Sequence, residues 1–411
     1  MKHKLPLDAL PLVPSGRGFK LLAGVRVLDL TSSVAGPYAA MLLGDMGAEV
    51  IKVERPGGDD ARAWGPPFLG GESLWFLSVN RNKQSLCLDY AKPGGRAILE
   101  ELVRAADVLI TNVPARVAAK LGIDYRATRA LNPRIVHASI TGFGADGARA
   151  DMPCYDLIAE GYSGVMDITG EADGEPQKVG APAADMLAGQ DAAFGALAAL
   201  FRRQTTGQGA FIDIALVDSM VRFLACRVTP YMGSGEVPRR TGAKDSVIAI
   251  YQAFETADEP ITLGLGNDAI WARFWDVLGN PSMVDDPRYA TNALRREQRT
   301  AIVARIQATL RTKPRAHWLA EFASARVPSG PVNRIDEVVA DPELLRRGVF
   351  YRTPAGAGDV PQVGAAIRID GAAGKPHLPP PALGEHSDRV LRDLLGRSSS
   401  EIAALRAQAI I

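Results

Sequence analysis

The chain has 411 residues, of which 47% are hydrophobic and 23% are charged. This length corresponds to two or three domains at roughly 150 residues each, and 47 basic against 46 acidic residues leave a net charge of +1. A charge so close to zero argues against binding to nucleic acid or a membrane through a general electrostatic field, so an anionic ligand must be held by a few placed cations.

The first half of the chain alternates short β-branched runs with helical segments. Strands are expected at residues 25–30, 49–54, 85–90, 107–112 and 135–140. Helices are expected at 36–47 and at 93–105, the second opened by a proline. Strands that alternate with helices of this length predict right-handed crossovers and a largely parallel sheet covered by helices.

The second half begins with an Ala- and Leu-rich helix and continues in a different composition. After that helix we expect a strand, a further helix, a linker or mobile loop rich in Gly, Pro and Arg, and a second strand and helix block. The corresponding ranges are 185–203, 210–216, 217–228, 229–246 and 248–340, the last with a strand at 261–265 and helices at 268–278 and 298–312. Two C-terminal helices are expected at 387–395 and 400–409, and Ser398 with Glu401 predicts a capping box.

Three cysteines and five histidines are scattered along the chain without metal-ligand spacing. Cys87, Cys154 and Cys226 form no Cys-x-x-Cys pair, which argues against zinc and against a disulfide framework and fits a reducing compartment. No apolar run approaches the roughly 20 residues needed to span a bilayer, and the basic start is not followed by an apolar signal region. We therefore expect a cytoplasmic protein without a metal.

One glycine-rich segment matches a nucleotide-binding pattern only superficially. Gly142–Gly147 reads G-x-G-x-x-G after a strand, but a turn follows it where a dinucleotide-binding fingerprint requires a helix. We interpret the segment as a structural loop. The sequence contains neither a Walker motif nor a G-x-S-x-G elbow, which argues against nucleotide hydrolysis and against a serine hydrolase.

Asp185 is a carboxylate among small and apolar residues just before the long helix. Two interpretations are open from the residues alone. Aspartate is a preferred helix N-cap, and capping is the more common role for such a residue. Alternatively, the surrounding Gly and Ala leave room for a ligand, and the start of a helix favours an oxyanion.

A set of basic residues lies at strand ends or in the loops that follow strands. In open α/β sheets ligands gather at the carboxyl ends of strands, so these cations are candidates for holding phosphates, although exposed Arg and Lys side chains are more often simply solvated. The set is Lys52, Arg55, Arg62, Arg81, Lys83 and Lys120.

Several segments, taken in order, carry a resemblance to a known family. The most specific is Gly44–Glu54 (GDMGAEVIKVE). The others are Leu22–Thr31 with Ala35–Pro37, Asn80–Ser85 with Leu88–Asp89, Ala106–Val108 with Asn112, Leu131–Val136, Ser329–Val332, Asp341–Pro342 and Leu383–His386. Over nearly its whole length the chain resembles the class III CoA-transferases, the group of formyl-CoA transferase, carnitine CoA-transferase and α-methylacyl-CoA racemase.

The resemblance implies an α/β fold in two domains. A large Rossmann-like, parallel-sheet, CoA-binding domain would be built from both termini, residues 1–228 and 341–411, and a smaller α+β domain with linkers would span 229–340. It also implies an interlocked homodimer, in which the two subunits thread through each other as rings.

The resemblance assigns Asp185 as the covalent nucleophile and coenzyme A esters as substrates, with no permanently bound cofactor. The CoA pocket would draw on a short set of residues, with the cations on its phosphates: Val34, Ala35, Arg55, Asn112 and Lys120. The family has Gly-Pro-Gly after the asparagine, whereas this chain has Pro114-Ala115-Arg116, which puts the local CoA contacts in question.

The implied reaction moves CoA from an acyl-CoA thioester to an acceptor carboxylate. With a reference pKa near 3.9, an aspartate is expected to be ionised at pH 7 without tuning and to form a mixed anhydride and then an aspartyl-CoA thioester. We expect backbone N–H groups at the helix start to stabilise the oxyanion and residues 233–245 to cover the site. The sequence names neither acid. Succinate or another dicarboxylate would suit Arg239, Arg240 and Lys244.

Two alternatives remain. The racemase branch carries Gly-His-Asp, where this chain has Cys154-Tyr155-Asp156, and a phenol is a poor base at pH 7. Tyr155 and Asp156 are therefore expected to support the site, with Asp156 orienting backbone or acceptor, unless it makes only a structural hydrogen bond. The other alternative is a CoA-ester-binding protein without turnover, against which the intact Asp185 argues.

Overall fold

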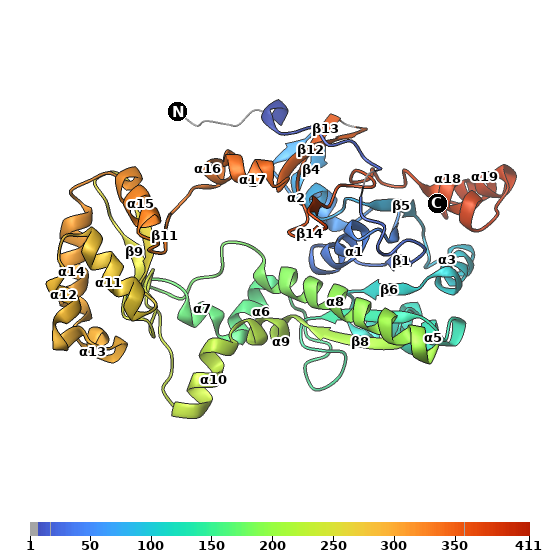
Figure 1. The fold of residues 1–411 in the computed structure, drawn as a ribbon. Helices are drawn as coiled ribbons and strands as arrows, with labels where there is room; N and C mark the ends of the chain where they lie inside the picture. The colour runs from blue at the N-terminus through green and yellow to red at the C-terminus, as the bar shows by residue number, and fades with distance from the viewer. Residues whose placement is uncertain (1–6, 17, 357) are drawn as a thin grey trace. The chain divides into compact units, whose positions relative to one another are not determined.

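The computed structural model describes residues 7–16, 18–356 and 358–411 and contains a six-stranded parallel sheet (Figure 1). The strand order is β5-β2-β1-β6-β7-β8, and every neighbouring pair is parallel. The strands are β1 (Arg26–Asp29), β2 (Glu49–Glu54), β5 (Lys83–Cys87), β6 (Val108–Thr111), β7 (Val136–Thr141) and β8 (Ala210–Ala215). The predicted parallel sheet is confirmed, with each predicted strand displaced by at most a few residues.

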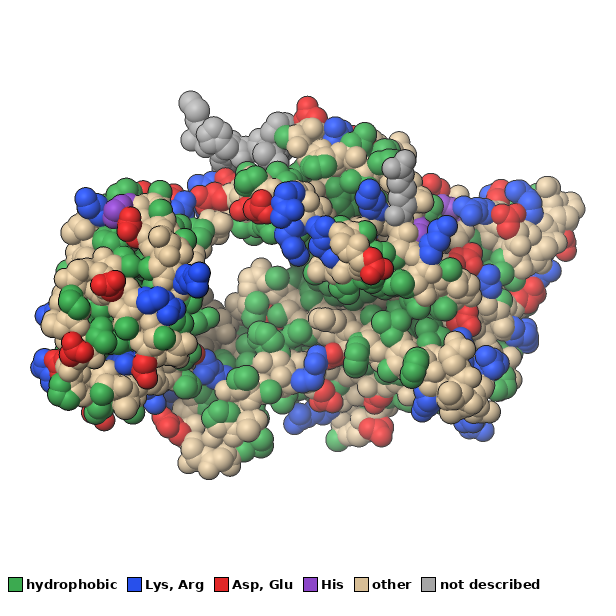
Figure 2. All heavy atoms as spheres, in the orientation of Figure 1, with side chains coloured by type: hydrophobic (Ala, Val, Ile, Leu, Met, Phe, Trp, Pro, Cys, Tyr) green, Lys and Arg blue, Asp and Glu red, His purple; other side chains and the backbone are tan. Residues whose placement is uncertain are grey.

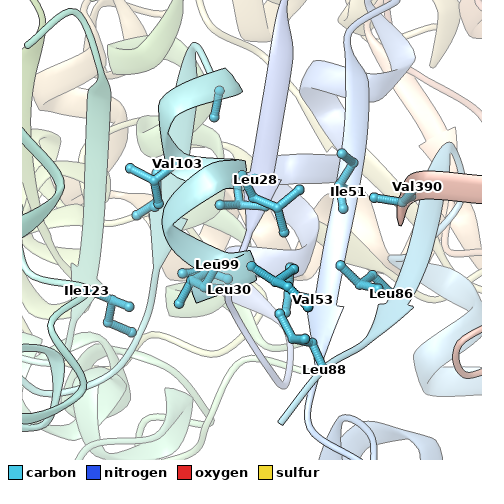
Figure 3. Packing of buried hydrophobic residues seen from close by; sticks show 14 of the residues in the cluster. Leu28, Leu30, Ile51, Val53, Leu86, Leu88, Leu99, Val103, Ile123 and Val390 are labelled. Carbon is cyan, nitrogen blue, oxygen red and sulfur yellow. The ribbon is translucent and has the colours of Figure 1, made fainter. Parts of the chain in front are cut away.

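The strands are largely buried on both faces because helices cover both sides of a parallel sheet. On one face, Leu28, Ile51 and Leu86 pack against α3 (Pro93–Ala105) and the C-terminal segment (Figure 3). Burial of each such side chain contributes ~1.5–3 kcal/mol. On the other face α1 (Ala35–Asp45) packs along α8 (Ala183–Thr206). Alternation along β1 therefore directs Leu28 into the core and Asp29 toward the α1 side.

The chain divides into two units, each with its own core. The first comprises residues 1–165, 178–235 and 339–411, and the second comprises 166–177 and 236–338. Besides the elements above, the first unit contains α2 (Leu74–Ser78), α4 (Ala115–Leu121), α5 (Tyr125–Leu131), α6 (Asp156–Ser163), α9 (Leu216–Phe223), α10 (Ala225–Ser234), α17 (Pro342–Arg346), α18 (Ser387–Arg389), α19 (Ser399–Ala407), the 3-10 helices η1 (Leu7–Ala9) and η2 (Asp60–Ala63), the π-helix η4 (Val390–Leu394), and the two-stranded pairs β3 (Phe68–Leu69) with β4 (Glu72–Ser73), β12 (Phe350–Ala355) with β13 (Gly358–Val363), and β14 (Arg368–Ile369) with β15 (Ala372–Ala373).

The second unit is an antiparallel three-stranded sheet, in the order β11-β10-β9, with helices around an aromatic core. Trp271, Phe274, Trp275 and Phe322 are almost completely buried in that core. Its elements are α7 (Val165–Ile168), β9 (Tyr251–Phe254), β10 (Ile261–Gly264), α11 (Asp268–Val277), α12 (Ser282–Asp285), η3 (Pro287–Tyr289), α13 (Asn292–Glu297), α14 (Arg299–Leu310), α15 (Arg315–Ser324), β11 (Ser329–Pro331) and α16 (Ile335–Val339).

Three local predictions meet different outcomes. The capping box is present, because the Ser398 hydroxyl accepts the N–H of Glu401 and the Ser398 N–H donates to the Glu401 carboxylate. The linker predicted from residue 229 onward is wrong at its start, since α10 continues to Ser234 with Pro230 inside the helix. The helix predicted at 387–395 is present as α18 followed by the π-helix η4.

Candidate active site around Asp185

Asp185 is the third residue of α8, three positions after the N-cap. The residue at the N-cap is Pro182, whose side chain makes no capping hydrogen bond. The interpretation of Asp185 as the N-cap is therefore wrong. In the first turn its carboxylate faces the positive end of the helix dipole, which favours negative charge.

The start of α8 is capped by a residue from another helix, Asp156 at the start of α6. Its Oδ1 accepts hydrogen bonds from the backbone N–H groups of Ala184 at 2.8 Å and of Asp185 at 3.3 Å. This contact fixes the backbone that carries the Asp185 side chain. The preceding Tyr155 is 71% exposed and lies at the N-cap of α6.

The environment of the Asp185 carboxyl disfavours its charge. Burial raises the pKa of Asp185 to about 7, and the nearby negative charge of Asp156 contributes to the rise. The expectation that this carboxylate is ionised at pH 7 without tuning is therefore wrong. Near neutral pH the protonated and ionised forms coexist, as is common for groups matched to a reaction.

The expected oxyanion site at the start of α8 is largely occupied. The N–H groups of Ala184 and Asp185 already donate to Asp156, and the N–H of Met186 donates to the carbonyl of Pro182. An oxyanion could accept hydrogen bonds from the N–H groups of Ala184 and Asp185 only if these groups gave up their hydrogen bonds to Asp156. The expectation is thus wrong for these amides, because the cap competes for the same donors.

Close packing of α8 on α1 brings Asp185 toward the predicted CoA residues Val34 and Ala35. A Cβ on Gly189 would lie 2.5 Å from the carbonyl oxygen of Ala35, so only glycine permits this approach. Residues four apart share a helix face, which places Asp185 one turn before Gly189 on the side facing α1. Val34, at the N-cap of α1, and Ala35 are both buried.

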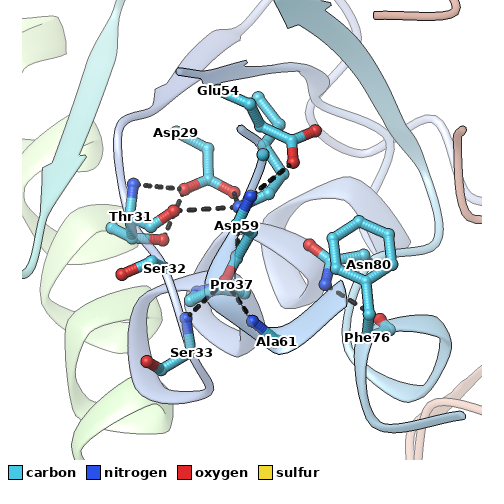
Figure 4. Close-up of polar contacts among 12 residues, drawn as sticks. Asp29, Thr31, Ser32, Ser33, Pro37, Glu54, Asp59, Ala61, Phe76 and Asn80 are labelled. Carbon is cyan, nitrogen blue, oxygen red and sulfur yellow. Dashed lines mark hydrogen bonds and ion pairs between the residues drawn. The ribbon is translucent and has the colours of Figure 1, made fainter. Parts of the chain in front are cut away.

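The loop from β1 to α1 is held by side chains from two neighbouring strands. Asn112, after β6, accepts the N–H of Ser32 at 3.1 Å and donates to its carbonyl at 2.7 Å. Asp59, after β2, accepts the N–H of Ser33 at 3.0 Å (Figure 4). Ser33 has φ of +71°, a strained conformation for a non-glycine residue that these bonds keep in place. Asn112 thus supports the loop that carries Val34.

A buried ion network lies behind this loop. Lys52 is 2.9 Å from Asp59 and donates to the carbonyl of Thr31, while Lys83 donates to Asp29 at 2.9 Å. All four charged side chains are buried. Burial would raise the pKa of Asp29, but Lys52 and Lys83 overcome that effect and lower it to about 2. Burial lowers the pKa of Lys83 to about 8, partly opposed by Asp29.

The buried network corrects the expectation for the basic residues at the strand ends. Lys52 and Lys83 are fully enclosed, Arg81 pairs with Asp45 at 2.6 Å, and Arg62 pairs with Glu54 at 2.7 Å. A phosphate role is therefore wrong for these four, because their charges are already neutralised inside the fold.

The two remaining cations of the set are exposed. Arg55 follows β2, pairs with Asp60 and donates to the carbonyl of Gly58. Lys120 lies in the last turn of α4. Across residues 7–16, 18–356 and 358–411, no hydrogen bond or ion pair joins either of them to the loop from β1 to α1.

The three basic residues considered for a second carboxylate lie in the second unit. Arg240 donates to the carbonyl and carboxylate of Asp167, and Arg239 is 3.7 Å from the same carboxylate. Lys244 is exposed and borders a pocket of about 670 Å³ in this unit, beside Tyr251. Arg240 is thus largely committed to Asp167, which leaves Arg239 and Lys244 as the more accessible cations.

Two residues that sequence reasoning missed support this region. Asp59 is a loop aspartate, and only the fold reveals that it bridges Lys52 and Ser33. Glu160 lies four residues after Asp156, a spacing that places both carboxyls on one face of α6. The spacing of four residues from Asp156 is the sequence signal that could have identified Glu160 as a neighbour of the site.

The described residues contain no cluster of three His, Cys, Asp or Glu side chains arranged to hold a metal ion. Separately, among the helices within the described residues, none combines the length and apolarity required to cross a bilayer.

Comparison with known proteins adds independent findings. The model of CoA-transferase family III matches residues 22–387. The chain is 38% identical over 394 residues to the succinyl-CoA:glutarate CoA-transferase of Mus musculus, covering 95% of this chain and 90% of that protein. It is 40% identical over 381 residues to the succinate–glutarate CoA-transferase of Agrobacterium fabrum, covering 91% and 95%. A CAIB/BAIF family protein from Brucella suis has a similar structure, with a TM-score of 0.81 and 37% identity over 92% of this chain and all of that one.

Proposed function

Because the chain belongs to CoA-transferase family III, we propose that Asp185 is the covalent nucleophile of its CoA transfer reaction. The observation that supports this role is the placement of Asp185. Its backbone is fixed by Asp156, and the fit of Gly189 against Ala35 directs its helix face toward the start of α1.

The reaction proceeds by exchange at three carbonyl carbons, those of the donor, of Asp185 and of the acceptor. The ionised Asp185 attacks the thioester carbonyl, the C–S bond breaks, and CoA thiolate leaves behind a mixed anhydride. The thiolate then attacks the Asp185 carbonyl, which releases the donor acid and forms an aspartyl-CoA thioester. The acceptor carboxylate attacks this thioester, the C–S bond breaks, and CoA thiolate leaves behind a second anhydride. The thiolate then attacks the acceptor carbonyl, which releases the new acyl-CoA and regenerates the Asp185 carboxylate.

A pKa of about 7 for Asp185 suits this sequence. A weakly solvated carboxylate of raised pKa is a stronger nucleophile than an exposed aspartate, and a substantial fraction is still ionised at neutral pH. Water must be excluded because it would hydrolyse the anhydride.

We assign the CoA site to the unit that contains both termini, at the loop from β1 to α1. Val34 and Ala35 lie at the start of α1, where helix N–H groups favour an anion, and Asn112 holds the loop from behind. Arg55 and Lys120 are the exposed cations assigned to the phosphates.

We propose succinyl-CoA as donor and a dicarboxylic acid of the glutarate type as acceptor. The relatives from Mus musculus and Agrobacterium fabrum are named for succinyl-CoA or succinate and glutarate. Arg239 and Lys244 are available to a second carboxylate because Arg240 alone is closely bonded to Asp167. Exchange assays with matched mono- and dicarboxylates test this choice. A preference for monocarboxylates would contradict it.

We further propose the interlocked homodimer. The first unit exposes large apolar side chains along successive helices, among them Phe194 at 73%, Phe201 at 82%, Phe223 at 58% and Met232 at 70%. Figure 2 shows hydrophobic side chains, in green, on one face of the molecule. Exposed apolar side chains that cluster on the surface of a single chain are typical of a site that binds another protein chain. The chain also leaves the first unit and returns to it, as threaded subunits require. Light scattering after size exclusion should give twice the monomer mass of 43.8 kDa.

The experiment for the proposed activity measures CoA exchange between succinyl-CoA and glutarate by the wild-type protein and by Asp185→Asn. The variant keeps the shape of the side chain but has no nucleophilic carboxylate. We expect exchange by the wild type and a loss of at least about a thousandfold in the variant. Equal exchange by the two proteins would contradict the role of Asp185.

A further inference from the structure

Glu160 is a buried carboxyl that the reaction above does not use. It lies on α6 one turn after Asp156, and its relative exposure is 0%. Glutamate is seldom fully buried without a partner for its charge. Its position therefore requires an explanation.

The two oxygens of Glu160 differ in their contacts. Oε2 accepts the N–H of Val179 at 2.9 Å, in the segment that leads into α8. Oε1 is buried and has no protein hydrogen-bond partner within the described residues. A buried carboxylate oxygen without a donor is costly, whereas a protonated oxygen carries its own donor.

The surrounding charges also favour the protonated acid. Burial raises the pKa of Glu160, as does the charge of Asp156 on the same helix, while the Val179 N–H and Lys178 act in the opposite direction. The Oδ1 of Asp156 is already occupied, since it accepts from the N–H groups of Ala184 and Asp185. Glu160 and Asp156 lie four residues apart on one face of α6, an arrangement in which two carboxyls can hold a single proton between them.

We propose that Glu160 is a positioning residue whose carboxyl proton is donated to Asp156, which thereby stays ionised and holds the start of α8. Glu160 also accepts the N–H of Val179, in the segment before α8. A single side chain thus holds both Asp156, which caps α8, and the segment that precedes the helix. The effect on catalysis rests on the proposed role of Asp185, but the shared proton does not.

The first test detects the proton without any activity. Infrared spectra at pH 7.5 are compared between Asp185→Asn and Asp185→Asn/Glu160→Gln, a background that removes the titrating carboxyl of Asp185. We expect a protonated-carboxyl C=O band in the first protein that is missing from the second. No difference would mean that Glu160 is ionised and would overturn the proposal. Glu175→Gln in the same background, at an exposed glutamate, should leave the band unchanged.

The second test separates positioning from general stability. Glu160→Gln retains an acceptor for Val179 and an N–H donor for Asp156, so we expect its kcat to stay within about threefold of the wild type. Glu160→Leu has neither group, and we expect its kcat to fall at least about tenfold with the KM for the acyl-CoA unchanged. Circular dichroism verifies that each variant is folded.

The outcomes distinguish the two proposals. An infrared band together with normal kcat in Glu160→Leu would overturn the positioning role. A glutamine variant as impaired as the leucine variant would overturn the donation to Asp156. If Asp185 were not the nucleophile, Asp185→Asn would retain exchange while the infrared band remained.

Discussion

The carboxylate of Asp156 accepts the backbone N–H of Asp185 at 3.3 Å, and its negative charge contributes to the raised pKa of the Asp185 side chain. One residue thus positions Asp185, the proposed nucleophile, and raises its pKa. The two effects arise from the same geometry, since a carboxylate close enough to cap the helix is also close enough to disfavour a second charge.

The rate of the first acyl transfer should follow the ionisation of Asp185. With a pKa of about 7, the ionised fraction rises about tenfold per pH unit below neutrality and levels off above pH 8. Single-turnover release of CoA thiolate from succinyl-CoA, measured between pH 5 and 9, should show this midpoint. A rate that is constant from pH 5 upward would contradict the raised pKa.

Asp185→Asn should stabilise the protein above neutral pH. The folded state raises the pKa from 3.8 to about 7, so it retains a proton that the unfolded chain releases between these values. Stability from this group is therefore present below pH 3.8 and is lost as pH rises through 7. Thermal unfolding should favour the asparagine variant by ~2–4 kcal/mol at pH 8 and by far less near pH 4. An equal difference at both pH values would contradict this account.

Gly189→Ala should disturb the packing of α8 on α1. The new Cβ would meet the Ala35 carbonyl oxygen at 2.5 Å, and backbone cannot move away cheaply. We expect a loss of ~1–3 kcal/mol in unfolding free energy and a fall in exchange rate. Gly195→Ala on the same helix is the matched control, because its Cβ meets only the side chain of Ile212. If Gly189→Ala and Gly195→Ala lowered the unfolding free energy and the exchange rate equally, the close approach of Gly189 to Ala35 would not explain the loss.

Asn112→Ala should weaken CoA-ester binding through the loop that carries Val34. The variant loses both hydrogen bonds to Ser32, each worth ~1 kcal/mol. We expect the KM for the acyl-CoA to rise by about tenfold with a smaller change in kcat. Asn112→Asp retains the acceptor for the Ser32 N–H and should be intermediate. A normal KM for Asn112→Ala would show that the loop from β1 to α1 does not contribute to CoA-ester binding.

Much of the fold was predictable because its strands are short, apolar and regularly separated by helices. The β2 strand was predicted at 49–54, where it lies. The cap of α8 was harder to predict from the sequence, because Asp156 supplies it from another helix and no capping residue precedes Asp185 locally. The positions of Lys52, Lys83 and Arg55 in the sequence do not show which of them are buried. Lys52 and Lys83 are buried in ion pairs, whereas Arg55 is exposed.

The family resemblance proposes which residues form the site, but it does not predict their hydrogen bonds or pKa values. Asn112 was expected to touch CoA, whereas its amide holds Ser32 on both sides. The pKa of Asp185 was expected to be ordinary, because burial and the distance to Asp156 are properties of the tertiary structure. The π-helix η4 likewise depends on packing that its periodicity does not encode.

The most direct test of the central claim is mass spectrometry of the protein incubated with succinyl-CoA, with peptide mapping after trapping by hydroxylamine or borohydride. The account predicts a modification on the peptide that contains Asp185 and its absence from Asp185→Asn. A protein that exchanges CoA but carries the modification on another residue, or forms none during turnover, would contradict the assignment of Asp185 as the nucleophile.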